Sequence, residues 1–274
     1  MYKALHLGSI GHNAGLQEAA PSLARHGVEG VWLDLDREMP FGSVKTRRTL
    51  EQYGLKAAGF GAPVRLDIPV AENAPVLRAY AEFAAALGMT RASSGIMPFS
   101  DTLPYAENYS LCLDRFGGSA DILYEYGIRL GIEFIGVPSL RQGHKYEFLY
   151  NMDQMLAFCN DVGDDRAGLL VDLFHFQLAG HTAADLARLR NEQVVLVHIM
   201  DAPALPVDQQ QDLVRGLPGS TGYLAIGPFL GALEAIGYDG PVLPEPFDAA
   251  LSAMPLDQAV ATVEAAVDKV WLMR

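Results

Sequence analysis

The sequence predicts an α/β fold of the (β/α)8 TIM-barrel class, formed as a single domain over residues 1–274. Short apolar runs alternate with segments of helical periodicity, a pattern typical of a parallel sheet. Eight such strand–helix units are present, and eight units in about 250 residues is the size of a TIM barrel. The turn at Gly8–Asn13 lacks the G-x-G-x-x-G pattern, which argues against an open dinucleotide-binding sheet.

The strands are expected where four to eight mostly apolar residues occur together. They lie, in order, at residues 4–7, 30–36, 55–60, 90–97, 129–135, 167–173, 194–199 and 241–243. The run at 90–97 is the weakest of the eight because it is the most polar, and the run at 167–173 is the most apolar.

The helices are expected where apolar residues recur at helical spacing between these runs. They lie at residues 16–26, before 53–54, at 74–87, 106–126 and 152–162, after Thr182, at 228–236 and at 256–272. Glycine ends three of them, at Gly54, Gly88 and Gly237. Thr182 with Asp185 matches a capping box, whereas Gly117-Gly118 weakens the expected helix in the middle of 106–126.

Composition excludes several functions. Half of the residues are apolar, which excludes a disordered chain. The net charge of −13 argues against nucleic acids and anionic membranes as partners. No run approaches the roughly 20 apolar residues of a membrane helix, and no signal peptide is recognisable. Cys112 and Cys159 have no metal or redox spacing, so we expect buried free thiols and a cytoplasmic protein.

Acidic or histidine residues interrupt four successive apolar strands near their ends. These are Glu133, Asp172, His198 and Glu245. The carboxyl ends of the strands form the active face of a TIM barrel, so the four side chains should converge. Buried carboxylates need a counter-charge, and the chain has no basic run nearby. The sequence therefore predicts one divalent cation bound by these four residues: Mn²⁺ is favoured, with Mg²⁺, Co²⁺ or Zn²⁺ as alternatives.

Four further residues are candidates for substrate binding. His175 and Asp201 each follow a candidate ligand by three residues, so each reaches the mouth only if its strand ends at that ligand. Arg215 lies in a glycine-rich loop where its guanidinium group can bind a substrate oxygen. His6 is near the end of the first strand. For each residue the alternative is a structural role, as a buried core side chain or a solvated loop charge.

The motifs around these residues resemble the xylose isomerase-like TIM barrels, a family of sugar phosphate isomerases and epimerases, and within it the inosose isomerase branch of inositol catabolism. The resemblance runs in order through the segments 131–136, 168–176, 198–201, 215–219 and 236–245, and before residue 129 it is only architectural. It implies that the four candidate ligands match the family's metal ligands and that His175 and Arg215 match positions that contact substrate. It also implies a homodimer or homotetramer.

Two features depart from the family pattern. The run Pro218–Tyr223 is one residue longer between its glycines and lacks an acidic residue, and prolines flank Glu245 on both sides. The segment before residue 129 builds the other half of the mouth, so the identity of the substrate is left open.

The expected activity is metal-dependent isomerisation or epimerisation of a keto-polyol or ketose, such as an inosose or a ketohexose. Glu133 and Glu245 would carry the proton through a metal-bound enediolate. The same first step would serve a lyase, such as an inosose or dehydroshikimate dehydratase or an enzyme that cleaves 3-keto-glycosides. A non-catalytic sugar-binding barrel is a second alternative, and the net charge disfavours a third, a metal-dependent endonuclease. An unphosphorylated sugar or cyclitol is the expected partner.

Overall fold

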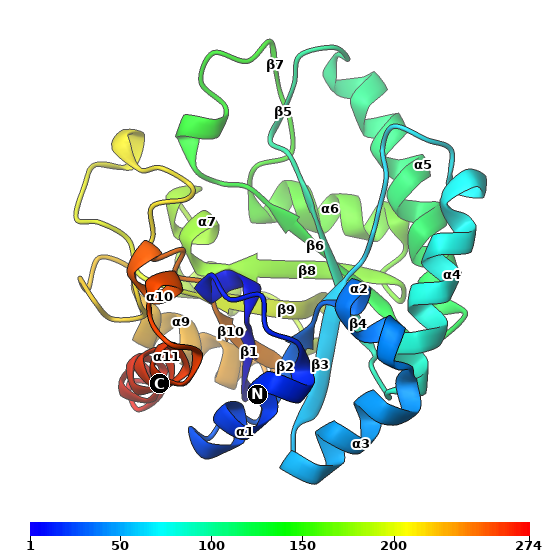
Figure 1. Ribbon diagram of the computed structural model, residues 1–274. Helices are drawn as coiled ribbons and strands as arrows, with labels where there is room; N and C mark the ends of the chain where they lie inside the picture. The colour runs from blue at the N-terminus through cyan, green and yellow to red at the C-terminus, as the bar shows by residue number, and fades with distance from the viewer.

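Eight parallel strands close into a barrel in the computed structural model, which describes residues 1–274 (Figure 1). The strands are β1 (Tyr2–His6), β2 (Gly30–Leu33), β3 (Lys56–Gly61), β4 (Arg91–Ile96), β6 (Arg129–Phe134), β8 (Ala167–Asp172), β9 (Val194–Ile199) and β10 (Pro241–Pro244). They are hydrogen-bonded in chain order, and β10 closes the barrel against β1. The predicted (β/α)8 fold is confirmed.

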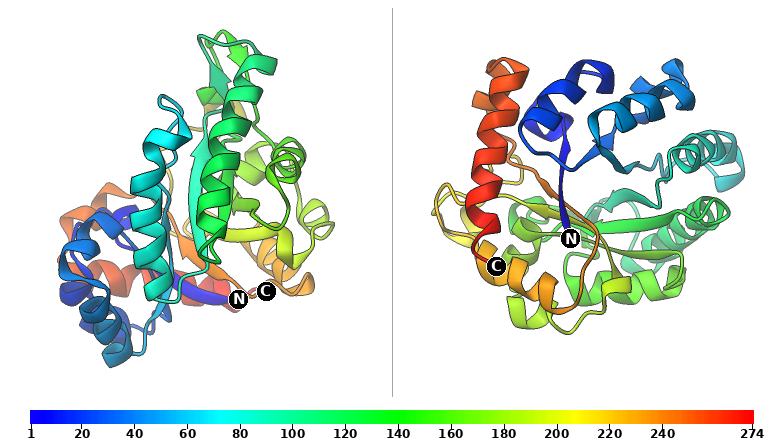
Figure 2. Two further views of the ribbon diagram at one scale, coloured as in Figure 1. Left: turned by 90° about the vertical axis from the view of Figure 1, so that its right-hand side faces the viewer. Right: turned by 90° about the horizontal axis from the view of Figure 1, so that it is seen from below.

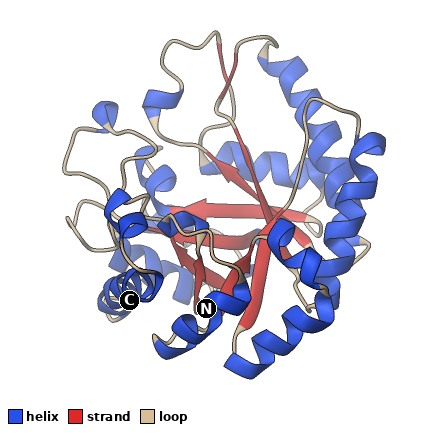
Figure 3. Ribbon diagram, viewed as in Figure 1, coloured by secondary structure: helices blue, strands red, loops and turns tan.

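Helices surround the barrel on its outer side, as Figure 3 and the two views of Figure 2 show. They are α1 (Leu16–Arg25), α2 (Leu35–Glu38), α3 (Ser43–Tyr53), α4 (Val70–Ala86), α5 (Tyr105–Tyr124), α6 (Met152–Val162), α7 (Leu173–Leu178), α8 (Ala183–Leu186), α9 (Ile226–Ala235), α10 (Ala249–Ala253) and α11 (Leu256–Trp271). The glycine pair does not break α5. Gly118 instead allows close packing, because a Cβ atom there would stand 2.9 Å from the side chain of Val70 on α4.

One local prediction was wrong, and one small element was missed. Strand β2 ends at Leu33 rather than at residue 36, because Asp34 turns out of the strand and caps α2. Its carboxylate accepts a hydrogen bond of 3.1 Å from the backbone N–H of Asp36. A two-stranded antiparallel ribbon, β5 (Phe99–Ser100) with β7 (Tyr146–Glu147), was not predicted, and it projects at the top of Figure 1. Strands of two residues carry too little periodicity to be recognised.

The barrel interior determines which residues reach its mouth. Six buried residues form a separate cluster: Ala4, Trp32, Ala58, Leu170, Leu196 and Leu243. Side chains alternate along a strand, so the residue two positions after an inward-facing one also points inward. His6, Asp172, His198 and Glu245 each follow a member of this cluster by two positions. The alternation therefore brings them to the carboxyl-terminal mouth of the barrel.

The two cysteines lie in the protein interior. Cys112 and Cys159 are free and buried, as predicted. None of the helices has the combination of length and apolar character needed to cross a membrane.

Candidate metal centre

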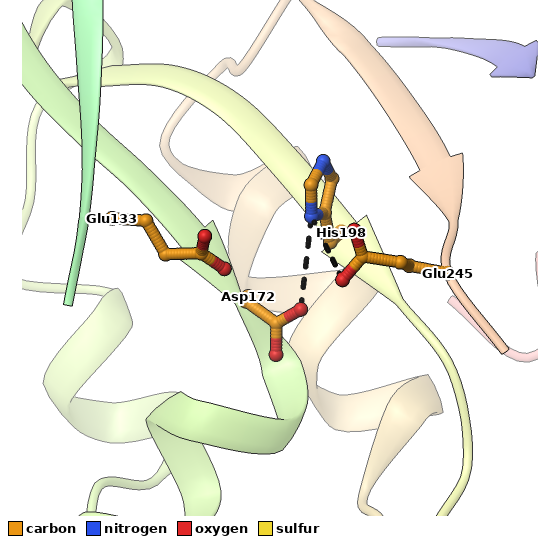
Figure 4. Close-up of side chains that lie close together, drawn as sticks. All are labelled: Glu133, Asp172, His198 and Glu245. Carbon is orange, nitrogen blue, oxygen red and sulfur yellow. Dashed lines mark ion pairs between the residues drawn. The ribbon is translucent and has the colours of Figure 1, made fainter. Parts of the chain in front are cut away.

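Four potential ligands meet at the mouth of the barrel (Figure 4). One ligand atom from each of Glu133, Asp172, His198 and Glu245 lies within 4.8 Å of the others. The Nδ1 atom of His198 faces two of the carboxylates, at 3.7 Å from Asp172 Oδ2 and 3.5 Å from Glu245 Oε2. The structure thus brings together the four residues that the sequence singled out.

Strand register explains this convergence. Asp172 on β8 is paired directly with His198 on β9, and His198 is paired with Leu243 on β10. Glu245 lies just beyond β10, yet its backbone N–H still donates to the carbonyl of Ile199 at 2.9 Å. That bond holds Glu245 in line with the sheet even though a proline stands on either side of it.

Arg215 supplies a counter-charge that the sequence did not reveal. Its Nη1 atom lies 3.0 Å from Asp172 Oδ2 and 2.7 Å from Glu245 Oε2. The sequence shows no basic run near the carboxylates, and the counter-charge comes instead from a single arginine in a distant loop. Arg215 is 43 residues from Asp172 and reaches it only because the loop after β9 folds back over the mouth.

The Arg215 side chain is held from several sides. Its Nη2 atom donates to Asp212 Oδ1 at 2.7 Å, and its guanidinium carbon lies 4.7 Å and 4.8 Å from the ring centres of Phe174 and Phe247. Phe247 has a φ of 42°, a strained left-handed conformation for a residue with a side chain. The sequence analysis did not identify the three side chains that hold Arg215, which are Asp212, Phe174 and Phe247. The only sequence signal for them is the three-residue spacing of Asp212 and Arg215, which suits an ion pair.

Burial and neighbouring charges shift the ionisation of the cluster. Burial, reinforced by the charges of Asp172 and Glu245, raises the pKa of Glu133 to about 8. Burial opposes the charged form of His198, but the two adjacent carboxylates outweigh it and raise the pKa to about 10. Burial likewise opposes ionisation of Asp172, but Arg215 and its other neighbours hold that pKa well below its usual range. Glu133 is therefore the carboxyl that most readily keeps a proton at neutral pH.

The donor set fits a divalent cation. The Nδ1 atom of His198 is buried and has no hydrogen-bond partner. Its separations from Asp172 and Glu245 are too long for hydrogen bonds of normal length. A buried nitrogen without a partner is costly, and binding a cation between these oxygens and this nitrogen would remove the cost. Three carboxylates and one imidazole suit Mn²⁺, Co²⁺ or Zn²⁺.

A cavity of about 230 Å³, referred to here as the inner cavity, opens onto this cluster. Three of the candidate ligands line it: Glu133, His198 and Glu245. His6 lines it as well, so this candidate substrate-binding residue lies at the mouth of the barrel. His175 and Arg215 are not part of the lining. They lie behind it, with the His175 Nε2 atom 3.0 Å from Arg215 Nη2. Their contact with substrate remains a prediction.

His175 is placed by the end of β8. Asp172 is the last residue of that strand and caps α7, accepting the backbone N–H of His175 at 3.0 Å. The chain therefore turns over the mouth immediately after the ligand, as the sequence required for His175 to reach the site. Burial lowers the pKa of His175 to about 4, so the ring is neutral at pH 7.

Asp201 has a different environment from the one the sequence suggested. Its side chain is fully buried and accepts backbone N–H bonds from four residues of the loop after β9: Ala202, Thr221, Gly222 and Leu224. A carboxylate with no exposed surface and all its acceptor sites engaged is not placed to contact a substrate. We propose that Asp201 instead shapes the loop that carries Arg215.

Replacement of Asp201 by asparagine should destabilise this loop. We expect Asp201→Asn to lower the free energy of unfolding by about 2–3 kcal/mol at pH 7, because an amide nitrogen would face buried N–H donors. Burial opposes the charge of Asp201, but the backbone N–H groups outweigh it and lower the pKa. Its stabilisation is therefore present above the unfolded-state pKa and is lost as the pH falls through the folded-state value.

Urea unfolding at several pH values measures this effect. Asp208→Asn is the matched control, since Asp208 is exposed in the same loop. The difference between Asp201→Asn and the parent should shrink in acid. A pH-independent difference, or one no larger than that of the control, would contradict the role of the Asp201 charge.

Together the fold and the cluster define a TIM-barrel protein with a candidate divalent-metal centre at the carboxyl ends of its strands. The chain belongs to the xylose isomerase-like TIM barrel family, whose model matches residues 15–269. This is a family of sugar isomerases and epimerases that bind sugar-like small molecules. The resemblance noted in the sequence is confirmed at this level.

The individual relatives share less than 30% of their residues with this chain. Over 145 residues the chain is 27% identical to the inosose isomerase of Bacillus subtilis (strain 168), a match covering 53% of this chain and 49% of that protein. The chain thus matches about half the length of such curated relatives. A xylose isomerase domain protein from Alicyclobacillus acidocaldarius is 26% identical with a TM-score of 0.88 over 100% of this chain and 99% of that one. The IOLI protein, solved with a bound zinc atom, is 19% identical with a TM-score of 0.83 over 98% of each chain.

Proposed function

We propose that this protein is a divalent-metal-dependent isomerase or epimerase of a keto-polyol or ketose, of inosose or ketohexose type. The observation that carries the proposal is the convergence of four ligand atoms within 4.8 Å of one another, at a cavity that three of the four residues line. The similarity to inosose isomerases over part of the chain favours a cyclitol ketone. Self-association as a homodimer or homotetramer, and a cytoplasmic location, remain predictions.

The four ligands would hold the cation, and Mn²⁺ is our first choice among the metals. Zn²⁺ is the main alternative, because a structural relative was solved with zinc bound. When bound, such a cation acts as a Lewis acid on a substrate carbonyl and makes the neighbouring C–H bond more acidic.

Proton transfer would fall to Glu133 and Glu245. Both line the inner cavity, from β6 and from the end of β10, so they flank whatever the cavity holds. The raised pKa of Glu133 and the lowered pKa of Glu245 give them different proton affinities. A carboxyl pair with separated pKa values can supply one base and one acid. One residue would take the proton from carbon and the other would return it.

His175 and Arg215 would support the two carboxylates from behind. Arg215 bridges Asp172 and Glu245 through one nitrogen, which fixes the orientation of Glu245 towards the cavity. His175, neutral at pH 7, contacts the second nitrogen of the same guanidinium group. We propose that either side chain reaches a substrate oxygen only if the loop after β9 shifts.

Metal binding should stabilise the folded protein. At a free Mn²⁺ concentration of about 100 times the dissociation constant, the gain is about 2.7 kcal/mol. This raises the midpoint of thermal unfolding by roughly 5–10 °C for a chain of this size. Calorimetric scans of chelator-treated protein with and without Mn²⁺ measure the shift. If no divalent cation produces a shift, the site is not a metal centre, and the metal-free sugar-binding barrel becomes the better explanation.

Product analysis tests the reaction itself. Chelator-treated protein, reloaded with Mn²⁺, is incubated with inososes and ketohexoses, and the products are identified by mass and NMR. We expect a product of unchanged mass that forms only with metal present. Loss of water would assign the site to a dehydratase, which shares the first proton abstraction, and would overturn the isomerase proposal.

A further inference from the structure

A second cavity adjoins the inner cavity, and none of the four candidate ligands lines it. This outer cavity has a volume of about 350 Å³. The two cavities share three lining residues: His6, Trp32 and Gly61. The inner cavity, at about 230 Å³, is smaller than most small-molecule sites, which span about 300–1,000 Å³, whereas the two together fall within that range.

Gly61 keeps the two cavities connected. It lies at the end of β3, and a Cβ atom built on it would meet nothing within 4 Å. Its backbone is not in the left-handed region, so a side chain at this position is not strained. Any larger residue at position 61 would therefore project into open space where the cavities join.

The charges of the lining argue against a phosphorylated substrate. No lysine or arginine lines either cavity. The outer cavity instead presents the carboxylates of Asp34 and Asp36. Arg37 is outside both linings and pairs with Asp34 at 3.3 Å. A phosphate group needs cations or free N–H donors, whereas carboxylates accept hydrogen bonds from hydroxyl groups.

Aromatic walls complete the outer cavity. The ring of Trp32 belongs to the barrel interior and also lines both cavities, while Tyr80 on α4 lines only the outer one. The hydroxyl of Tyr80 donates a hydrogen bond to Asp36, which holds the ring and the carboxylate together. Apolar ring faces beside a few oriented polar groups are typical of small-molecule sites, and sugar rings offer matching C–H faces and hydroxyl edges.

We infer that the substrate is an unphosphorylated keto-polyol that carries a second hydroxylated ring, such as a glycosylated ketose. This rests on the proposed function, because the keto end of the molecule lies in the inner cavity beside Glu133 and Glu245. The second ring lies in the outer cavity between Trp32 and Tyr80. Its hydroxyl groups donate to Asp34 and Asp36.

Binding calorimetry with Mn²⁺-loaded protein tests this inference using three sugars: D-fructose, isomaltulose (a glucosylated fructose) and D-fructose 6-phosphate. Isomaltulose should bind at least about tenfold more tightly than D-fructose, and the phosphate should bind more weakly than either. Gly61→Val, which places bulk between the cavities, should remove most of the preference for isomaltulose. Tyr80→Ala, which removes a wall of the outer cavity, should reduce the same ratio. Tyr124→Ala, at an exposed tyrosine on α5, is the matched control and should leave the ratio unchanged.

The outcomes separate the inference from the function on which it rests. Binding of D-fructose with no gain for isomaltulose would overturn the inference and leave the proposed function in place. Preferential binding of the phosphate would also overturn it. If neither D-fructose nor isomaltulose binds in a Mn²⁺-dependent manner, a ketose substrate is excluded, and the inference fails with it. A preference for isomaltulose that persists in Gly61→Val would show that the second ring lies elsewhere.

Discussion

Glu133→Gln is expected to lower turnover of the keto-polyol substrate by about 10³-fold or more while the barrel remains folded. The amide has the size of the carboxyl group but can neither take a proton from carbon nor return one. Glu133 lines the inner cavity, and burial raises its pKa to about 8, so it is the residue of the cluster best suited to hold a proton at neutral pH. Glu245→Gln should have a comparable effect, since the proton must also be returned.

The effect of each substitution on turnover must be distinguished from an effect on metal binding, because Glu133 and Glu245 are also candidate metal ligands. Metal content and Mn²⁺ affinity are therefore measured on each variant, and residual activity is compared at saturating metal. Glu51→Gln, on the exposed face of α3, is the matched control and should behave as the parent. A Glu133→Gln or Glu245→Gln protein that binds metal and turns over at the parent rate would rule out the proposed proton transfer.

Asp172→Asn is expected to lower both metal affinity and stability. Asp172 is fully buried, accepts from Arg215 at 3.0 Å and faces His198. Removing its charge leaves part of the positive charge of Arg215 and His198 unbalanced in the interior. Breaking a buried ion pair costs about 3–5 kcal/mol, and we expect the lower end because Arg215 keeps Glu245 and Asp212. Mn²⁺ affinity should fall by at least about 10²-fold.

Asparagine is an informative replacement because it is also a good N-cap. It preserves the hydrogen bond from the backbone N–H of His175 that begins α7, so the change is mainly one of charge. Asp248→Asn is the matched control, since Asp248 caps α10 through the same type of bond at 2.9 Å. Urea unfolding and Mn²⁺ calorimetry on both variants give the comparison. Unchanged Mn²⁺ affinity in Asp172→Asn would remove Asp172 from the ligand set.

The fold and the four candidate ligands were predictable because both follow from local pattern. The alternation of apolar strands and helices indicated the barrel, and its parallel strands bring their carboxyl ends to one mouth. Asp172 and His198 each follow an inward-facing leucine by two positions, which is visible in the sequence. The departures were local as well: Asp34 ends β2 early through a side-chain cap that outweighs the apolar run around it.

The surroundings of the site were not predictable, because they depend on contacts between distant segments. Arg215 reaches Asp172 only through the path of a loop, and Asp201 serves four backbone N–H groups of that loop rather than the mouth. Trp32 belongs to the core of the barrel, and it also lines both cavities. Such double roles follow from three-dimensional placement and leave no pattern in the sequence.

Deuterium incorporation tests the central claim most directly. Mn²⁺-loaded protein is incubated in D₂O with an inosose, and the recovered sugars are examined by mass spectrometry and NMR. Proton transfer by Glu133 and Glu245 predicts a product isomer that carries deuterium on a carbon next to the carbonyl. This labelling should require metal and should be lost in Glu133→Gln. Labelling that persists without metal or in Glu133→Gln, or a product that has lost water, would contradict a metal-dependent isomerase built on these residues.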